Sequence, residues 1–278
     1  MLRVIRYDRL PTEQRHPRSQ HLDRLSTLAL VRLMHREDAR AVAAIGRALP
    51  QIARAAALIA RRLRRGGRLW FIGAGTSGRL GVLEAAECPP TFHTDPSLVQ
   101  AIIAGGARAV FRSQEGAEDD RTRIRRAVDR RVRMADVVVG ITASGVTPFV
   151  DEALRRARRC GARTVLVTSH ARSPIPSHVR IRLPVGPELL SGSTRLKAGT
   201  ATKLALNMLT LGAMVRLGNT HGNLMVDVRP TSRKLRARAV QIIQSLAGCS
   251  ASEAASSLRA ARGRVRVAVQ RITERSTR

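Results

Sequence analysis

The chain has 278 residues, 44% of them apolar, which is enough for a sizeable core in one large or two small domains. Its apolar runs are short, and its first ten residues have neither an apolar signal core nor a cleavage site. We therefore expect no membrane-spanning segment and no secretory signal. Three cysteines lie far apart without a C-x-x-C pair, which argues against a disulfide framework or a zinc site and favours a reducing cytoplasm.

The formal net charge of +30 suggests a nucleic-acid ligand, but the distribution of the charge argues against one. Only three of the 50 basic residues are lysine, and the arginines are spread over most predicted helices rather than gathered in one arm. Such an excess of arginine is typical of a GC-rich genome. One Trp, one Tyr and four Phe offer few platforms for stacking bases. We expect no specific nucleic-acid partner.

Strands and helices alternate along the first two thirds of the chain. A first helix is predicted over 39–64, divided by Pro50 and ended by Gly66-Gly67. Apolar strands are predicted over 68–72, 98–104, 136–142, 163–168 and 179–183. Helices are predicted between them over 77–86, 117–133 and 148–159, the first stopping at Cys88-Pro89-Pro90. This order predicts an α/β fold with a doubly wound parallel sheet and helices on both faces.

Strand signals stop after Pro187. Helices are predicted over 194–217 and 231–246, and Ser250-Ala251-Ser252-Glu253 is a capping box that opens a further helix. We expect residues 1–230 to form one α/β domain that includes an N-terminal helical segment. Residues 231–278 are expected to form a small C-terminal helical segment.

The loop after the first strand, Gly73-Ala74-Gly75-Thr76-Ser77-Gly78, matches the G-x-G-x-x-G pattern of dinucleotide folds. However, the second strand ends in IIAGG, without the acidic residue that would hold a ribose. Both this loop and the loop after the third strand, TASGVT at 142–147, carry hydroxyl groups. Two such loops at the carboxyl edge of a parallel sheet suit one phosphomonoester better than a pyrophosphate. The alternative is that these hydroxyls only cap the following helices.

Carboxylates cluster next to these loops, although the chain has only 20 acidic residues. Glu84 and Glu87 lie three residues apart on one predicted helix, and EGAEDD at 115–120 follows the second strand. General acid–base catalysis needs carboxyl groups whose environments separate their pKa values. The alternative for each acid is an ion pair with arginine, and Asp119 and Asp120 also suit the start of a helix.

Several segments together resemble the N-acetylmuramic acid 6-phosphate etherases, a family of the sugar-isomerase (SIS) domain superfamily. These segments are TEQRHPRS…LDRLST, IGAGTSGRLGVLEAAECPP, IIAGG, EGAEDD, VVVGITASGVTPFV and LSGSTRLKAGTATKLALNMLTLGAMVRLGNTHGNLMVDV. They follow the family's order from about residue 12 to 260. The resemblance implies an SIS-type, sugar-phosphate-binding catalytic domain over residues 1–230, a homodimer, and neither metal nor organic cofactor. It also implies cleavage of the D-lactyl ether of N-acetylmuramic acid 6-phosphate, giving N-acetylglucosamine 6-phosphate and D-lactate.

The resemblance also assigns roles to residues. It implies Glu87 of ECPP and Glu118 of EGAED as the two catalytic acids, and we expect Glu87 to be the acid and Glu118 the base. Implied sugar-phosphate ligands are Gly75, Thr76, Ser77, Thr142, Ser144, Gly145 and Thr147. Glu84 is expected to support the site or to pair with an arginine. The chain departs from the family at His16, Val146, Thr202 and His221, which bears on substrate affinity more than on reaction type.

Two other functions remain open from the sequence. One is an aldose–ketose isomerase of the same superfamily, which would use a carboxylate base and a phosphate loop but release no lactate. The other is a noncatalytic sugar-phosphate sensor, as in the related glucokinase regulatory protein. The presence of both Glu87 and Glu118 within their motifs argues against a sensor.

Overall fold

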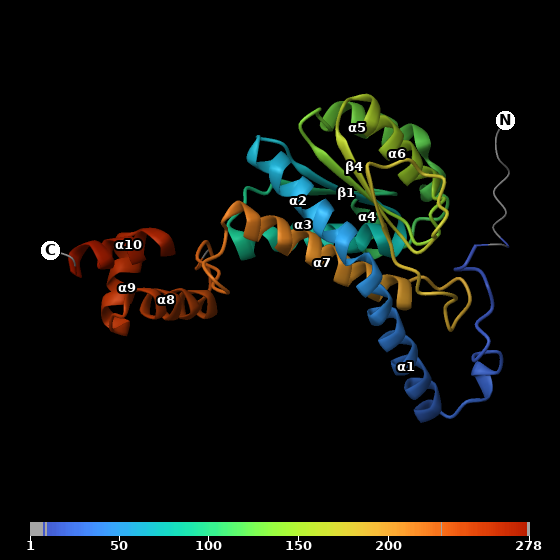
Figure 1. Ribbon diagram of the computed structural model, residues 1–278, viewed down its shortest axis with the longest axis horizontal. Coiled ribbons are helices and arrows are strands. Elements are labelled where there is room, and N and C mark those ends of the chain that lie inside the picture. Colours follow the sequence, from blue (N-terminus) through green and yellow to red (C-terminus); the bar gives the residue numbers. More distant parts are fainter. Residues whose placement is uncertain (1–7, 9, 229, 277–278) are drawn as a thin grey trace.

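The computed structural model describes residues 8, 10–228 and 230–276, and its centre is one parallel sheet (Figure 1). The expectation that the N-terminus carries no secretory signal concerns mainly residues 1–7 and 9, outside the described part. Five strands lie in the order β2-β1-β3-β4-β5, and all neighbours are parallel. They are β1 (Leu69–Gly73), β2 (Val99–Ile103), β3 (Val137–Ile141), β4 (Arg163–Thr168) and β5 (Val179–Arg182). All five predicted strands are confirmed to within one residue at each end.

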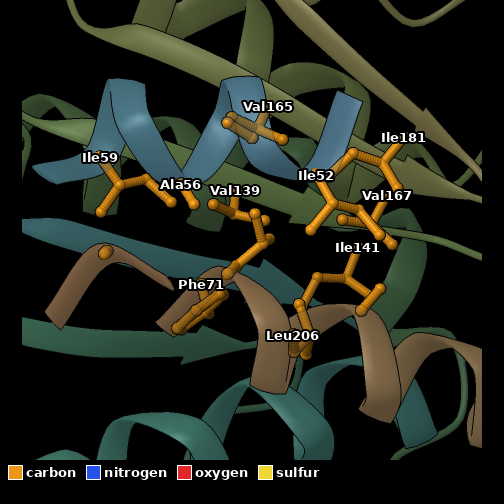
Figure 2. Packing of buried hydrophobic residues seen from close by; sticks show 14 of the residues in the cluster. Ile52, Ala56, Ile59, Phe71, Val139, Ile141, Val165, Val167, Ile181 and Leu206 are labelled. Carbon is orange, nitrogen blue, oxygen red and sulfur yellow. The ribbon is translucent and has the colours of Figure 1, made fainter. Parts of the chain in front are cut away.

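Helices cover both faces of the sheet, as the alternation of strands and helices predicts. Successive side chains of a strand point to opposite faces, so Trp70 and Ile72 of β1 lie in one core and Phe71 in the other. The first core is covered by α5 (Arg121–Arg131) and α6 (Pro148–Arg159). The second is covered by α2 (Leu49–Arg64), α3 (Gly75–Phe92) and α7 (Lys197–Leu217). Figure 2 shows α2 and α7 side chains meeting the strands in this second core.

The start of the first helix differs from the prediction. α1 (Thr27–Ile45) begins at Thr27 rather than at residue 39, because the Ser26 side chain accepts the Ala29 N–H and caps the helix. A short 3₁₀ turn follows α1, and α2 then starts at Leu49 with Pro50 in its first turn, where no N–H is needed. Pro50 therefore divides the two helices, as expected.

The predicted end of α3 at Cys88 is also wrong. The helix continues through Pro89 and Pro90 to Phe92 and ends at His93, whose φ is 54°. Prolines cannot donate helical hydrogen bonds, but only the last turn loses them here. Cys88 and Phe92 are both buried in the core, and this packing holds the turn in place.

One helical stretch of the described residues, Thr27–Arg64, is long and apolar enough to cross a membrane by length and composition alone. The short apolar runs of the sequence had predicted no such stretch. In the folded protein, 44% of the most apolar 18-residue part of this stretch is buried. Ile52, Ala55 and Ile59 of α2 lie in the core that α7 also covers, and a core helix of this kind passes the same test.

The last helices form a separate cluster at one end of the molecule (Figure 1). α8 (Arg233–Ala247), α9 (Ala251–Ala260) and α10 (Val265–Ser276) share their own apolar core. The predicted capping box is present, since Ser250 and Glu253 exchange side-chain and backbone hydrogen bonds. Val226 and Val228 also belong to this core. The predicted domain boundary after residue 230 stays a prediction.

Candidate active site

The first glycine loop brings the start of α3 directly against the end of β1. A Cβ on Gly73 would lie 2.8 Å from the Gly78 nitrogen, and one on Gly78 would lie 2.7 Å from the Gly73 oxygen. Only glycines allow this close approach. Ala74 precedes α3, and no side chain of the described residues caps the helix. The first N–H groups of α3 are therefore available to an anionic ligand.

The second loop gathers three hydroxyl groups after β3. Thr142 Oγ1 lies 2.8 Å from Thr147 Oγ1 and 3.1 Å from Ser144 Oγ, and the last two oxygens are 3.5 Å apart. Thr142 and Ser144 also accept the backbone N–H groups of Gly145 and Val146. In the described chain no side chain caps α6 either. The alternative that these hydroxyls merely cap helices is therefore not what the structure shows.

The two loops meet because β1 and β3 are adjacent and parallel, with Gly73 paired to Ile141. Between them lies a cavity of about 350 Å³, within the range of roughly 300–1,000 Å³ typical of ligand sites. Its polar lining from the predicted loops and acids comprises Ser77, Thr142, Ser144, Thr147, Glu118 and Asp119. A larger cavity of about 640 Å³ lies among the C-terminal helices, and none of the described residues that line it is a carboxylate.

Three of the predicted ligand residues do not line the polar cavity. Thr76 is turned toward α7, where its methyl group would lie 3.6 Å from a Cβ on Gly199. Gly75 and Gly145 shape the loops instead, with φ values of 52° and 73°. A Cβ on Gly145 would also lie 2.8 Å from the Cβ atoms of His170 and Ser173, so this position requires glycine.

Glu118 lies at the cavity wall on a single 3₁₀ turn, Ala117–Asp119. Burial raises the pKa of its carboxyl group, and the charges of Asp119 and Glu115 raise it further. A perturbed carboxyl group in a cleft is a candidate for general acid–base chemistry. Asp120 has a structural role, as the sequence suggested, because its side chain accepts the Arg123 N–H at the start of α5.

Glu87 lies outside this cavity in its own chain. It is exposed on α3, ten residues after Ser77, which corresponds to about 15 Å along the helix axis. Glu87 and Glu118 therefore do not line the same cavity within one chain. Burial raises the pKa of the neighbouring Cys88 thiol to about 12, with smaller contributions from the charges of Glu84 and Glu87.

Glu84 links α3 to α7. It is 5% exposed, and its two oxygens accept hydrogen bonds from Lys203 Nζ and Thr210 Oγ1, both at 2.7 Å. The expected arginine partner was wrong, since the cation is a lysine. These bonds fix the two helices relative to each other.

One wall of the cavity was not predicted from the sequence. Leu10 and Glu13 of the N-terminal segment line it, together with Gly192 and Thr194 from the loop before α7. The only available signal was the TEQRHPRS motif, for which the sequence suggested no role. No lysine or arginine among the described residues lines this cavity. Among the described residues, no three His, Cys, Asp or Glu side chains form a group that could hold a metal ion.

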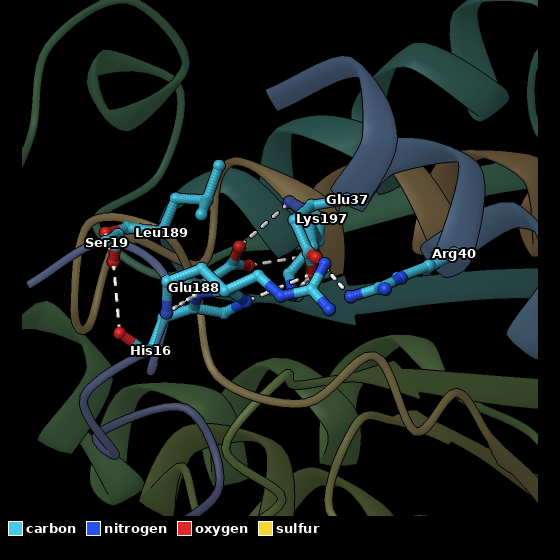
Figure 3. Close-up of polar contacts among 9 residues, drawn as sticks. His16, Ser19, Glu37, Arg40, Glu188, Leu189 and Lys197 are labelled. Atoms are coloured by element: carbon cyan, nitrogen blue, oxygen red, sulfur yellow. Dashed lines mark hydrogen bonds and ion pairs between the residues drawn. The ribbon is translucent and has the colours of Figure 1, made fainter. Parts of the chain in front are cut away.

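A buried polar cluster holds this N-terminal segment (Figure 3). Glu37 of α1 lies 3.1 Å from both His16 Nε2 and Lys197 Nζ and 2.6 Å from Arg40. Burial raises the pKa of Glu37. The hydrogen bonds of Glu37 to Lys197 and His16, and the positive charges of these two residues, lower it by more, so the pKa is lowered overall. Glu188 accepts the backbone N–H groups of the first two residues of α7.

The positions that depart from the etherase pattern fall in different surroundings. His16 belongs to the buried cluster, and Val146 adds an apolar side chain to the cavity wall. Thr202 is buried in α7, and His221 pairs with Leu224 in an isolated bridge away from the sheet.

Known proteins match this chain over most of its length. Residues 51–158 match the family described as glucokinase regulatory protein N-terminal SIS domain, and residues 117–212 match the SIS domain. The N-acetylmuramic acid 6-phosphate etherase of Gloeobacter violaceus is 55% identical over 94% of this chain and 86% of its own length. The chain belongs to the N-acetylmuramic acid 6-phosphate etherase family. The etherase of Symbiobacterium thermophilum is 50% identical over 94% of this chain and 88% of its own length.

Solved structures share the fold at low sequence identity. A phosphoheptose isomerase from Francisella tularensis has a TM-score of 0.53 at 17% identity, covering 68% of this chain and 98% of its own. A protein from Escherichia coli CFT073 has a TM-score of 0.52 at 17% identity, covering 72% of this chain and 97% of its own. These likenesses confirm the predicted SIS-type sheet.

Proposed function

We propose that this chain is an etherase that cleaves the D-lactyl ether of N-acetylmuramic acid 6-phosphate. The products are N-acetylglucosamine 6-phosphate and D-lactate. The observation that supports this most, for a chain of this family, is the cavity in which two hydroxyl loops face a carboxyl group of raised pKa. The two loops suit the phosphate, and the carboxyl group suits proton transfer at the sugar.

The phosphate would bind without a cationic side chain from the cavity wall. Ser77, Ser144 and Thr147 offer hydroxyl donors, and the starts of α3 and α6 offer backbone N–H groups. A helix N-terminus favours negative charge through the aligned peptide dipoles. The net charge of the chain, +30, adds a long-range attraction for an anionic substrate.

The reaction follows from the chemistry of the substrate. Ring opening gives an aldehyde at C1, which makes the C2 hydrogen acidic and the C3 ether a β leaving group. A base removes the C2 proton, the bond between C3 and the ether oxygen breaks, and an acid protonates the departing lactate. Water then adds at C3, and a proton returns to C2. Each positioned acid or base is worth roughly 10²–10⁴-fold in rate.

We assign the base to Glu118 and the acid to Glu87. The raised pKa of Glu118 makes its carboxylate a stronger base than an ordinary glutamate. Glu87 lies about 15 Å from the cavity of its own chain along α3, so we propose that it serves the cavity of a second copy. This makes the active unit a homodimer.

Exposed apolar side chains on α3 and α7 support the homodimer. Leu83 precedes Glu87 by one helical turn on the same side of α3 and is 39% exposed. On the neighbouring α7, Met208, Leu211 and Val215 are exposed by 39%, 53% and 48%. A second copy packed on this surface would remove these side chains from water and cover Glu87.

A lactate-release assay on purified protein with N-acetylmuramic acid 6-phosphate tests the reaction. Co-expression of Glu87→Gln and Glu118→Gln chains with different tags tests the two-copy arrangement, because a heterodimer then keeps one complete pair of acids. We expect about half of the wild-type rate in the heterodimer and little in either homodimer. An inactive heterodimer of normal mass would place both acids in one chain.

Two alternatives are less favoured. The phosphoheptose isomerase of similar structure shares only the fold, at 17% identity. A noncatalytic sensor is suggested only by the domain match over residues 51–158. Sugar-phosphate conversion without lactate would support the isomerase, and binding without turnover would support the sensor.

We also place the enzyme in the cytoplasm, a proposal that rests on its widely separated cysteines and on the expected metabolic role.

A further inference from the structure

The N-terminal segment 10–19 lies across the loop that precedes α7 and closes one side of the cavity. The Thr12 carbonyl accepts the Gly192 N–H at 3.1 Å, and Ser19 Oγ donates to the Leu189 carbonyl at 2.7 Å. Leu10 and Thr12 are 4% and 1% exposed, although the segment has no regular secondary structure. Such burial shows that the segment is part of the folded site.

His16 anchors this segment to the rest of the protein (Figure 3). The Arg18 backbone N–H donates to His16 Nδ1 at 3.2 Å, and Nε2 on the other side of the ring lies 3.1 Å from Glu37. Glu37 in turn binds Lys197, the first residue of α7. The segment is therefore fixed to both α1 and α7, and so is the position of Glu13 three residues before His16.

Glu13 presents a carboxylate to the cavity. One of its oxygens accepts the Thr12 hydroxyl at 3.0 Å, and the other would lie 3.1 Å from a Cβ on Gly192. No lysine or arginine of the described residues forms an ion pair with it, although the chain has 50 basic residues. An unpaired carboxylate on a cavity wall is positioned for a hydrogen-bond donor of a ligand.

The chemistry of the substrate decides which part of it Glu13 can hold. An ionised carboxylate only accepts hydrogen bonds, and it repels the phosphate and the lactyl carboxylate. The sugar hydroxyl groups are donors. We infer that Glu13 is a substrate-binding residue that accepts a hydrogen bond from a sugar hydroxyl while the phosphate lies at the loops of Ser77 and Ser144. This inference rests on the proposed function only for the identity of the sugar phosphate.

The test measures binding of the product N-acetylglucosamine 6-phosphate by calorimetry, which needs no catalysis. Hydrogen bonds to charged groups contribute enough that Glu13→Ala should raise Kd by roughly 10- to 100-fold. Glu13→Gln keeps the shape and should cause a smaller rise. The neighbouring exposed Gln14→Ala is the matched control and should change Kd less than about twofold. Because Glu13 is exposed, its variants should unfold at the wild-type temperature. His16 is buried, so His16→Ala should unfold at a lower temperature.

The outcomes separate this inference from the proposed function. A Kd for Glu13→Ala within twofold of wild type overturns the inference even if the wild-type protein releases lactate. A large rise in Kd supports it even if no lactate is released, and in that case only the etherase proposal fails. A wild-type protein that binds no sugar phosphate overturns both.

Discussion

Ser144 offers the sharpest test of where the phosphate binds. Its hydroxyl lies on the cavity wall, 3.1 Å from Thr142 Oγ1, and accepts the Val146 N–H at 3.3 Å. In Ser144→Ala, Thr142 keeps its 2.8 Å contact with Thr147 and still accepts the Gly145 N–H. The loop therefore loses about 1 kcal/mol of stability at most, and its shape should persist.

The effect on the substrate should be larger than the effect on folding. A hydrogen bond to a charged phosphate contributes roughly 1.5–3 kcal/mol, equivalent to a change of about 10- to 150-fold in affinity. Because the phosphate is remote from C2 and C3, binding is lost equally in the ground and transition states. We expect KM to rise with little change in kcat.

The assay combines the substitution with removal of the phosphate from the ligand. Lactate release gives KM and kcat, and calorimetry compares N-acetylglucosamine with its 6-phosphate. Ser177→Ala is the control, because the Ser177 hydroxyl is buried without a hydrogen-bond partner in the described structure. If Ser144→Ala weakens both sugars equally, Ser144 does not bind the phosphate and the loop assignment is wrong.

Three further predictions concern the acids, the buried cluster and the reaction path. In the wild type, kcat/KM should rise with pH through the raised pKa of Glu118, above the ordinary glutamate value of about 4.3; Glu118→Gln should lose this limb and most lactate release. Lys197→Met should lower the free energy of unfolding by roughly 3–5 kcal/mol in urea titrations, because Glu37 stays buried without the positive charge of the lysine. Lys234 is exposed, so the control Lys234→Met should change the free energy of unfolding by less than about 0.5 kcal/mol. In ¹⁸O water, mass spectrometry should find the label at C3 of N-acetylglucosamine 6-phosphate, and label in the lactate hydroxyl would contradict elimination.

The first four strands were predictable because each has an apolar run at its centre, whereas β5 shows only an alternation of Val and Ile with Arg. Helix ends were less predictable than strands, because they depend on single contacts. Ser26 starts α1 by accepting one N–H, and nothing in the apolar pattern marks that position. Pro89 and Pro90 indicate a helix end, yet packing of Phe92 outweighs the lost hydrogen bonds.

The site was predictable as far as local sequence determines it. The two hydroxyl loops follow strands that pair in the sheet, so their meeting follows from the fold. Thr76 and Ser77 could not be told apart, because adjacent helical residues point in directions about 100° apart and only the tertiary structure shows which faces the cavity. Glu13 was missed because its place depends on the buried contact between His16 and Glu37, across 21 residues.

The way α3 is held favours two copies in the active unit over movement within one chain. Glycines fix its start, since side chains at Gly73, Gly78 or Gly81 would lie under 3.0 Å from neighbouring atoms. Glu84 then ties its middle to α7 through Lys203 and Thr210. Sliding α3 far enough to bring Glu87 into its own cavity would break both sets of contacts. Association of a second copy needs neither to break, and it buries apolar side chains that one chain leaves in water.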